Sequence, residues 1–307
     1  MLVVKIKGGL GNQMFEYAMA KRLQIMYGID RIGLELSVIE QDSLRECNLS
    51  AFALYDRIEI INWPDRIVCL QEFLRKKLVS YFIAGRKEET AEKREDFLAG
   101  LFAVFGIVQR DHSQIEEHLF LRFHKNLYLN GWFQNAKKLL PIREELLADF
   151  KMELPELADS NICKQIQACN AVCVHIRRGD YVKHPIFDVC TDDYYYRAIE
   201  YMISNVKNPV FFIFSDDIEQ IKETMNFTRP SYIQRIIYID ENHEPYEDLY
   251  LMQQCRHFII SNSTFSWWAQ FLGNAPDKIV VAPARWRNGE YNNRKSIYME
   301  KWILMEV

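Results

Sequence analysis

The second half of the chain alternates between short apolar segments and helical patterns, and this alternation is the strongest constraint on its fold. The first such segment, residues 172–176, is largely apolar and β-branched, as in a strand buried on both faces of a sheet. Similar strands are expected at residues 210–214, 235–239, 257–260 and, as the last strand, 279–282, with helices between them. Repeated strand–helix alternation predicts a parallel, doubly wound sheet.

The first half opens with an expected strand at residues 2–6, a glycine-rich loop and a helical pattern that runs to Gly28. Such a loop lets backbone amides approach a ligand closely, and a helix N-terminus favours negative charge. The loop is not a dinucleotide fingerprint, because Met14 stands where the third glycine would be, and no Lys-Ser/Thr ending of the P-loop kind follows. A structural tight turn is about as good an interpretation, although Asn12 and Gln13 add polar side chains at its rim.

Length and turn signals divide the chain in two. At 307 residues it is too long for one typical domain. An expected helix at residues 136–151 is followed by Leu154-Pro155-Glu156, which has the composition of a linker. We therefore expect domains at residues 1–153 and 154–307, with a last helix that could cross back onto the first domain.

Composition excludes several classes of function. Lys plus Arg, 38, nearly balance Asp plus Glu, 42, so no overall field attracts nucleic acid and any anion site must be local. The 7 cysteines form no C-x-x-C pair, which favours reduced, mostly buried thiols over disulfides or zinc. The sequence starts with the expected strand rather than a signal peptide, and no apolar run approaches the ~20 residues of a membrane span. We expect a cytoplasmic protein with no integral membrane segment.

Polar side chains follow three of the expected strands. The carboxyl ends of parallel strands meet at one edge, where ligands bind in open α/β sheets, so these groups can converge on one ligand. They are Arg177, Arg178 and Asp180 after the first strand, Ser215, Asp216 and Asp217 after the second, and Ser261, Asn262, Ser263 and Thr264 before a helix that opens at Phe265.

These residue types suit a nucleoside diphosphate. Arginine offers a fixed, charged fork for phosphate oxygens, and Ser263, Thr264 and the helix amides supply hydrogen bonds. Asp216 or Asp217 can accept from a ribose hydroxyl or from the N–H edge of guanine. Two structural alternatives stand beside this hypothesis: a surface ion pair for the arginines, with Asp180 as partner, and helix N-capping for the other aspartates.

The sequence carries no metal-binding pattern. It contains no D-x-D triplet, and no His/Asp cluster suggests a metal cage. If a nucleoside diphosphate leaves here, arginine and helix amides must stabilise it in place of Mg²⁺, and losing one such donor typically costs about 2.7–4 kcal/mol of barrier. We therefore expect no metal and no other cofactor.

The chain carries four motifs in order, at residues 8–15 (GGLGNQMF), 175–181 (HIRRGDY), 214–217 (FSDD) and 261–269 (SNSTFSWWA). Together they resemble the motifs of the bacterial α-1,2-fucosyltransferases of glycosyltransferase family 11. Residues 131–134 (GWFQ) resemble a further segment of that family, which usually has Tyr where this chain has Trp132. The resemblance implies a GT-B-like α/β fold of two Rossmann-like domains with a donor cleft between them. It also implies a GDP-β-L-fucose donor, no metal, and inversion at the anomeric carbon.

The resemblance further implies roles for individual residues. Arg177 would bind the β-phosphate and assist its departure, so we expect it to be catalytic together with Asp180 and Asn12. The implied donor-binding residues are Gly9, Gly11, Gln13, His175, Arg178, Ser215, Asp216, Asp217, Asn262, Ser263, Thr264 and Phe265. The implied acceptor-binding residues are Trp132, Gln134 and His184, although core packing is the commoner use of an aromatic pair such as Trp132 and Phe133. The general base stays open among Asp180, His184, Asp188 and Glu16.

The implied acceptor is a terminal β-galactoside. It could be lactose, N-acetyllactosamine or an O-antigen or glycolipid glycan, and the sequence does not separate these. The alternative functions are a sugar-nucleotide transferase that makes another linkage, such as α-1,6, and a protein that binds a sugar nucleotide without transferring the sugar. The N-terminal domain would serve the acceptor and the C-terminal domain GDP-fucose, in a cytoplasmic enzyme that is at most peripheral to the inner membrane.

Overall fold

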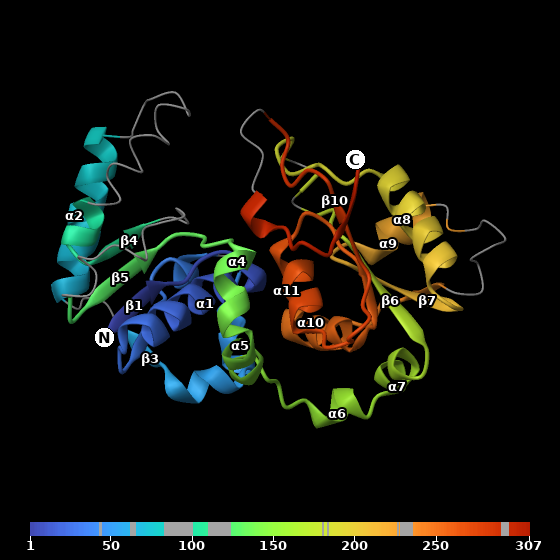
Figure 1. Ribbon diagram of the computed structural model, residues 1–307, viewed down its shortest axis with the longest axis horizontal. Coiled ribbons are helices and arrows are strands. Elements are labelled where there is room, and N and C mark those ends of the chain that lie inside the picture. Colours follow the sequence, from blue (N-terminus) through green and yellow to red (C-terminus); the bar gives the residue numbers. More distant parts are fainter. Residues whose placement is uncertain are drawn as a thin grey trace. The chain divides into compact units, whose positions relative to one another are not determined.

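The chain divides into two compact units, Met1–Lys151 and Met152–Val307 (Figure 1). The structure is a computed structural model that describes residues 1–42, 45–61, 66–82, 101–109, 124–179, 181–182, 184–225, 227, 236–289 and 295–307. Our expected boundary falls close by, after residue 153. Each unit has a parallel sheet of its own.

The first unit is built on a parallel sheet in the order β3-β2-β1-β5-β4. Its strands are β1 (Leu2–Lys5), β2 (Ile32–Glu35), β3 (Glu59–Ile61), β4 (Ile107–Gln109) and β5 (Leu127–Asn130). The chain runs from β1 outwards to β3 and later returns to the other side of β1 as β5. The strand order therefore reverses between β1 and β5, the position where open α/β sheets bind ligands.

The helices in the described part of the first unit are α1 (Leu10–Tyr27), α2 (Arg66–Phe82), α4 (Ala136–Leu139) and α5 (Arg143–Asp149), with short 3₁₀ turns η1 (Ile39–Gln41), η2 (Asn48–Ala51), η3 (Ala53–Arg57) and η6 (Leu140–Ile142). The sequence predicts only the first of them and a helix near the end of the unit. Gly28 ends α1 in a left-handed conformation, φ 63°, as predicted. The expected single helix at residues 136–151 is wrong. Pro141 lies in η6, between α4 and α5, because proline has no N–H to continue a helix.

The second unit confirms the predicted doubly wound parallel sheet, in the order β11-β10-β9-β6-β7-β8. Its strands are β6 (Asn170–Ile176), β7 (Pro209–Ser215), β8 (Ile236–Tyr238), β9 (His257–Ile259), β10 (Val280–Pro283) and β11 (Ile303–Met305). Two expectations for the end of the chain are wrong. Residues 280–283 are not the last strand, and the final element is not a helix that crosses back, because β11 adds to β10 within the same sheet.

The helices of the second unit alternate with these strands. They are α6 (Pro155–Ala158), α7 (Asn161–Gln167), α8 (Asp192–Asn205), α9 (Ile218–Thr224), α10 (Pro245–Gln254) and α11 (Thr264–Leu272), with a 3₁₀ turn η8 (Lys295–Ile297). The expected linker at residues 154–156 instead begins α6, where Pro155 takes a first-turn position at which its missing N–H costs nothing.

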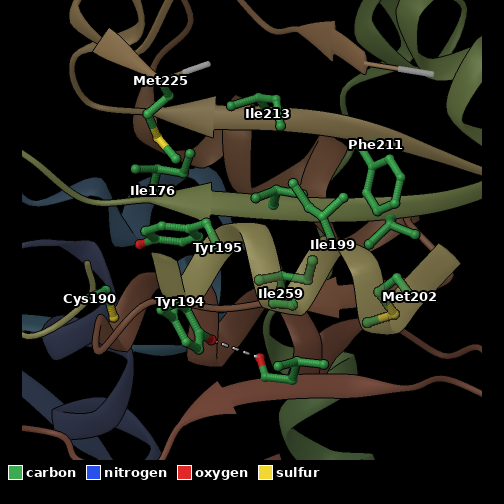
Figure 2. Packing of buried hydrophobic residues seen from close by; sticks show 14 of the residues in the cluster. Ile176, Cys190, Tyr194, Tyr195, Ile199, Met202, Phe211, Ile213, Met225 and Ile259 are labelled. Carbon is green, nitrogen blue, oxygen red and sulfur yellow. Dashed lines mark hydrogen bonds between the residues drawn. The ribbon is translucent and has the colours of Figure 1, made fainter. Parts of the chain in front are cut away.

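Helix α8 packs against the middle of the second sheet and fixes the position of β6 (Figure 2). Its buried residues recur at helical spacing, among them Tyr194, Ile199 and Met202. The Tyr194 hydroxyl donates to the carbonyl of Ile260 at 2.6 Å, just after β9. Burying one large apolar side chain contributes about 1.5–3 kcal/mol to the free energy of folding. The packed core around α8 therefore holds the carboxyl ends of β6 and β9 in fixed positions.

None of the helices that the structure describes is long and apolar enough to cross a membrane. The cysteines whose side chains are described are free thiols; Cys163, Cys173, Cys190 and Cys255 are buried, and Cys47 and Cys169 are partly exposed.

Candidate functional site

The three polar segments predicted to converge follow adjacent strands of the second sheet. Strand β6 lies between β7 and β9, and Ile176 pairs in register with Ser215. The chain moves from β6 to β7 and β8 on one side and returns to β9 on the other. The strand order therefore reverses between β6 and β9, and the polar segments surround the position where α/β sheets bind ligands.

Arg177 stands at the carboxyl end of β6 with its guanidinium held from two directions. Its Nη1 lies 3.3 Å from Oδ2 of Asp216, and its Cζ lies 5.3 Å from the centre of the Tyr181 ring. Asp216 also accepts from the backbone N–H of Arg178 at 2.8 Å. A Cβ on Gly179 would collide with Oδ2 of Asp216, so a glycine is needed for this close approach. Asp180, our expected partner of the arginines and a predicted catalytic residue, lies outside the described residues.

Arg178 points to a different partner. Its Nη2 contacts Oδ1 of Asp192, the first residue of α8, and its side chain is only 13% exposed. This pair joins the end of β6 to the start of α8, a partner that the sequence did not reveal. The two adjacent arginines are thus each matched to one carboxylate, Asp216 or Asp192.

His175 is a neutral, buried histidine beneath Arg177. Its Nδ1 lies 3.0 Å from Oγ of the buried Ser261, which links the ends of β6 and β9. Burial, together with the nearby charge of Arg177, lowers the pKa of His175 to about 3. Its ring lies 5.6 Å from that of Phe265. The predicted contact of His175 with guanosine stays a prediction.

Helix α11 begins at Thr264, a short segment after the end of β9 at Ile259. Ser263 is its N-cap, and its Oγ accepts from the N–H of Phe265 at 3.2 Å. Thr264 and Phe265 form the first turn and are partly exposed. A helix N-terminus carries partial positive charge, so this turn favours an anion.

Asn262, which we predicted to bind the donor, uses its amide inside the protein. It is buried, and its Nδ2 donates to the carbonyls of Phe187 at 2.9 Å and Trp286 at 3.1 Å. Its Oδ1 lies 3.5 Å from Sγ of Cys190. The side chain thus ties together the segments that follow β6 and β10.

The three polar residues after β7 have different roles. Asp217 is the N-cap of α9 and accepts from the N–H of Gln220 at 3.3 Å, which confirms N-capping for one of the two aspartates. The Ser215 hydroxyl accepts from the N–H of Asp217 at 3.1 Å. Asp216 is the carboxylate that turns towards Arg177.

In the first unit, the glycine loop after β1 is held by Gln13. This buried side chain donates from Nε2 to the carbonyls of Gly8, at 2.9 Å, and Glu46, at 2.8 Å, and its Oε1 accepts from the N–H of Asn48 at 3.1 Å. Gly9 is the N-cap residue of α1 and Gly11 lies in the first turn. Gln13 therefore fixes the loop that we predicted to contact the sugar.

The segment after β5 meets that loop. Nε2 of Gln134 donates to Oδ1 of Asn12 at 2.9 Å, so a predicted acceptor residue and a predicted catalytic residue are in contact. The aromatic pair divides: Phe133 is buried in the core with a left-handed backbone, φ 46°, whereas Trp132 is 39% exposed. Nζ of Lys7 lies 4.5 Å from the centre of the Trp132 ring. Trp132 is therefore the member of the pair that can stack on a ligand.

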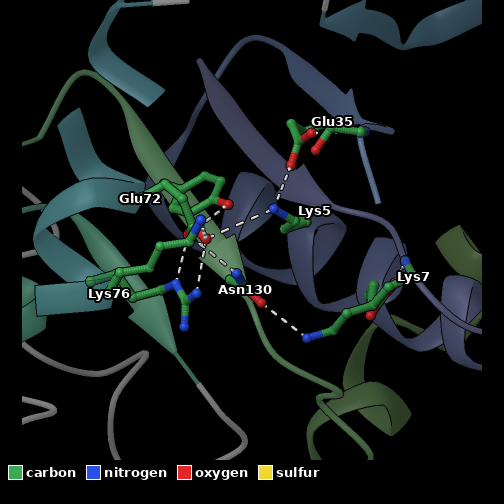
Figure 3. A network of polar contacts seen from close by, with 10 residues as sticks. Lys5, Lys7, Glu35, Glu72, Lys76 and Asn130 are labelled. Carbon is green, nitrogen blue, oxygen red and sulfur yellow. Dashed lines mark hydrogen bonds and ion pairs between the residues drawn. The ribbon is translucent and has the colours of Figure 1, made fainter. Parts of the chain in front are cut away.

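A buried charge network that the sequence did not lead us to expect lies beside this segment (Figure 3). Lys5 contacts Glu35 at 3.3 Å and Glu72 at 3.8 Å. Glu72 also accepts from Tyr128 at 3.1 Å and from Asn130 at 3.4 Å. Lys5 and Glu35 pair in register on β1 and β2, so opposite charges in two consecutive apolar strands were the available signal. Oδ1 of Asn130 accepts from Nζ of Lys7 at 2.9 Å, and Lys7 lies over the Trp132 ring, so Lys7 connects the network to Trp132.

The candidates for the general base differ in accessibility. His184 and Asp188 are exposed, in the loop after β6. Glu16 is fully buried on α1, and burial raises its pKa well above the usual range. Its Oε2 accepts from the N–H of Lys7 at 2.9 Å. The base therefore stays open among the exposed residues and Asp180.

Comparison with known proteins identifies the family. The model of the family described as "Glycosyl transferase family 11" matches residues 1–306 of this chain. The chain is 31% identical to the O-antigen biosynthesis glycosyltransferase WbnK of Escherichia coli, over 97% of this chain and 98% of that protein. It is 29% identical to an alpha-1,2-colitosyltransferase of Escherichia coli, over 99% of both chains. A galactoside 2-alpha-L-fucosyltransferase Sec1 of Mus musculus is 23% identical over 58% of this chain and 56% of its own.

The fold has solved counterparts. The crystal structure of the fucosyltransferase NodZ from Bradyrhizobium superposes with a TM-score of 0.50 at 11% identity, covering 88% of this chain and 92% of that chain. Two Rossmann-like parallel sheets confirm the GT-B-like α/β fold class. The chain belongs to glycosyltransferase family 11 and is a glycosyltransferase.

Proposed function

We propose that this enzyme transfers L-fucose from GDP-β-L-fucose to O2 of a terminal β-galactoside, with inversion at the anomeric carbon and without a metal ion. Relatives named for sugar transfer to a 2-position, among them a colitosyltransferase and a fucosyltransferase, support the linkage. The observation that carries the proposal is Arg177, held by Asp216 at the end of β6, with the N-terminus of α11 following the adjacent strand.

The chemistry follows from where charge develops. As the bond between C1 of fucose and the β-phosphate oxygen breaks, negative charge grows on the departing GDP. The Arg177 guanidinium and the amides of the first turn of α11 stabilise that charge, and each such donor is worth about 2.7–4 kcal/mol of barrier. The acceptor O2 attacks C1 from the face opposite the diphosphate and releases its proton to a base, which we leave unassigned.

The exposed indole of Trp132 supports an acceptor role for the first unit. An aromatic face with a polar rim suits the apolar face of a sugar ring. Gln134 lies in the same segment as Trp132, after β5, and it is hydrogen-bonded to Asn12 in the glycine loop after β1. We assign Trp132 and Gln134 of the first unit to acceptor binding, whereas the role of His184, in the exposed loop after β6, stays a prediction.

A colitosyl donor is the second candidate. It is favoured by the 29% identity to an alpha-1,2-colitosyltransferase over nearly the whole chain. Colitose is L-fucose without the hydroxyl at C3, so both donors present the same anomeric chemistry. The two candidate functions therefore differ only in whether the site contains groups that bind the C3 hydroxyl.

The test incubates the enzyme with lactose in EDTA and with either GDP-fucose or GDP-colitose, and measures GDP release and the product linkage. We expect GDP release and an α-1,2-fucosylated lactose without added metal. Lactose lacking the galactose 2-hydroxyl is the matched control and should give no product. Product only after Mn²⁺ addition would refute the metal-free mechanism. Product only with GDP-colitose would show that colitose, and not fucose, is the sugar transferred.

A further inference from the structure

Four planar side chains form a continuous series that starts at Arg177. Its Cζ lies 5.3 Å from the centre of the Tyr181 ring, and the rings of Tyr181 and Phe187 are stacked at 5.3 Å with an interplanar angle of 30°. On Phe187 rests Arg287, with its Cζ 5.1 Å from the ring centre. The series thus links the end of β6 with the segment after β10, and the proposed reaction does not by itself account for its last three members.

The backbone that carries the series is fastened by two asparagines. Asn262 donates to the carbonyls of Phe187 and Trp286. Asn288 donates from its backbone N–H to the carbonyl of Ile186 at 2.9 Å, and from Nδ2 to those of Pro185 and Asp188, both at 2.7 Å. The loop after β6 is therefore bound to the segment after β10 by hydrogen bonds on both sides of Phe187. Such a fastened loop can hold a ring in one orientation.

Arg287 differs from Arg177 and Arg178 in its partner. Arg177 pairs with Asp216 and Arg178 with Asp192, whereas Arg287 meets no carboxylate among the residues that the structure describes. Partial burial lowers the pKa of Arg287, and a guanidinium stays charged at neutral pH. Its contact is the face of Phe187, and a desolvated cation is attracted to such a face. Arg287 therefore packs against Phe187, at the end of the series that is farthest from Arg177.

We propose that Tyr181, Phe187 and Arg287 are positioning residues that fix the plane of the Arg177 guanidinium towards the leaving diphosphate. The ion pair with Asp216 restrains the position of the Arg177 guanidinium, and the Tyr181 ring adds a restraint on its orientation. Phe187 packs on Tyr181 and Arg287 packs on Phe187, so each later member keeps the one before it in place. The inference rests on the proposed function, because it assigns Arg177 to a diphosphate, and small displacements of such a group can cost about 10²-fold in rate.

The test is a double-mutant cycle read by GDP affinity in calorimetry and by kcat with GDP-fucose. Phe187→Leu removes the middle ring but keeps apolar volume. We expect it to lower kcat about 10-fold and GDP affinity several-fold. In an Arg177→Ala background the same change should cost nothing further in GDP affinity, because the group that it positions is gone.

Conservative variants separate positioning from folding. Arg287→Lys keeps a cation for the Phe187 face and should retain most activity, whereas Arg287→Met keeps only the apolar stem and should lose several-fold in kcat at an unchanged melting temperature. Equal losses of GDP affinity from Phe187→Leu with and without Arg177 would overturn the role while leaving the proposed function intact. A wild-type chain that binds no GDP would overturn both.

Discussion

Two neighbouring carboxylates follow β7, and their environments give them different roles. Asp217 accepts from an N–H of α9 and is therefore a cap. Asp216 approaches Arg177 and the N–H of Arg178, which is possible because Gly179 has no side chain. An arginine oriented in advance by a carboxylate needs little rearrangement when a phosphate arrives, which is how electrostatic preorganisation lowers a barrier.

His175 makes stability depend on pH. The folded protein holds this histidine neutral with a pKa of about 3, whereas in the unfolded chain it has the ordinary value of 6.5. Below pH 6.5 the unfolded state thus binds the extra proton, so folding stability falls as the pH falls towards 3. Between pH 7 and pH 5 the wild type should lose about 2 kcal/mol more than His175→Gln. Urea unfolding of both proteins at the two pH values measures this; parallel losses would show that His175 does not carry it.

At the scale of elements, side-chain hydrogen bonds hold the loop after β6 in place, instead of the backbone hydrogen bonds that join neighbouring strands. Its residues make turns of their own, such as the bond from the N–H of Tyr181 to the carbonyl of Arg178 at 2.8 Å. The connection to the rest of the unit runs through Asn262 and Asn288. A loop fastened in this way can carry functional side chains with the precision of a strand end.

Asn262→Ala should destabilise the protein by about 1–3 kcal/mol, because it leaves the buried carbonyl of Trp286 without a donor. Asn288→Ala is the matched control. Its side chain bonds to exposed carbonyls, which water can satisfy, so its loss should be about 1 kcal/mol or less. Urea midpoints compare the two. An Asn262→Ala protein of normal stability that no longer binds GDP would instead support the predicted role of Asn262 in donor binding.

At the scale of the whole molecule, each unit has its own parallel sheet, with a strand-order reversal beside its central strand. The groups suited to a diphosphate lie in the second unit, and the exposed Trp132 lies in the first. Separate cores allow the units to unfold in separate transitions, because two-state behaviour is not expected of a multidomain chain.

GDP should therefore stabilise one unit selectively. At a concentration 100 times its dissociation constant it should add about 2.7 kcal/mol to the unit that binds it. Calorimetry would follow the two transitions, and near-ultraviolet circular dichroism would identify the second unit by the edge-to-face pair of Trp267 and Trp268, 5.1 Å apart. A shift of the first unit alone would reverse our assignment of the donor.

Local patterns were enough to predict much of this architecture. The strand at residues 172–176 and the glycine end of α1 follow from apolar runs and turn residues, which act over a few neighbours. The prediction of one helix at residues 136–151 was wrong because apolar spacing continues across Pro141, whereas the helical hydrogen bonds do not. The strand β11 was missed because its three residues carry too little periodicity to stand out.

The sequence by itself determined which charged and polar groups follow which strands, since parallel strands place their carboxyl ends at one edge whatever the details of packing. Only the tertiary structure decided the partners. Arg177 meets Asp216, from the next strand along the sheet, and Arg178 meets Asp192 of α8. Ion pairs and ring stacking act over a few ångströms between residues distant in the chain, so their pairing depends on packing that no local pattern encodes.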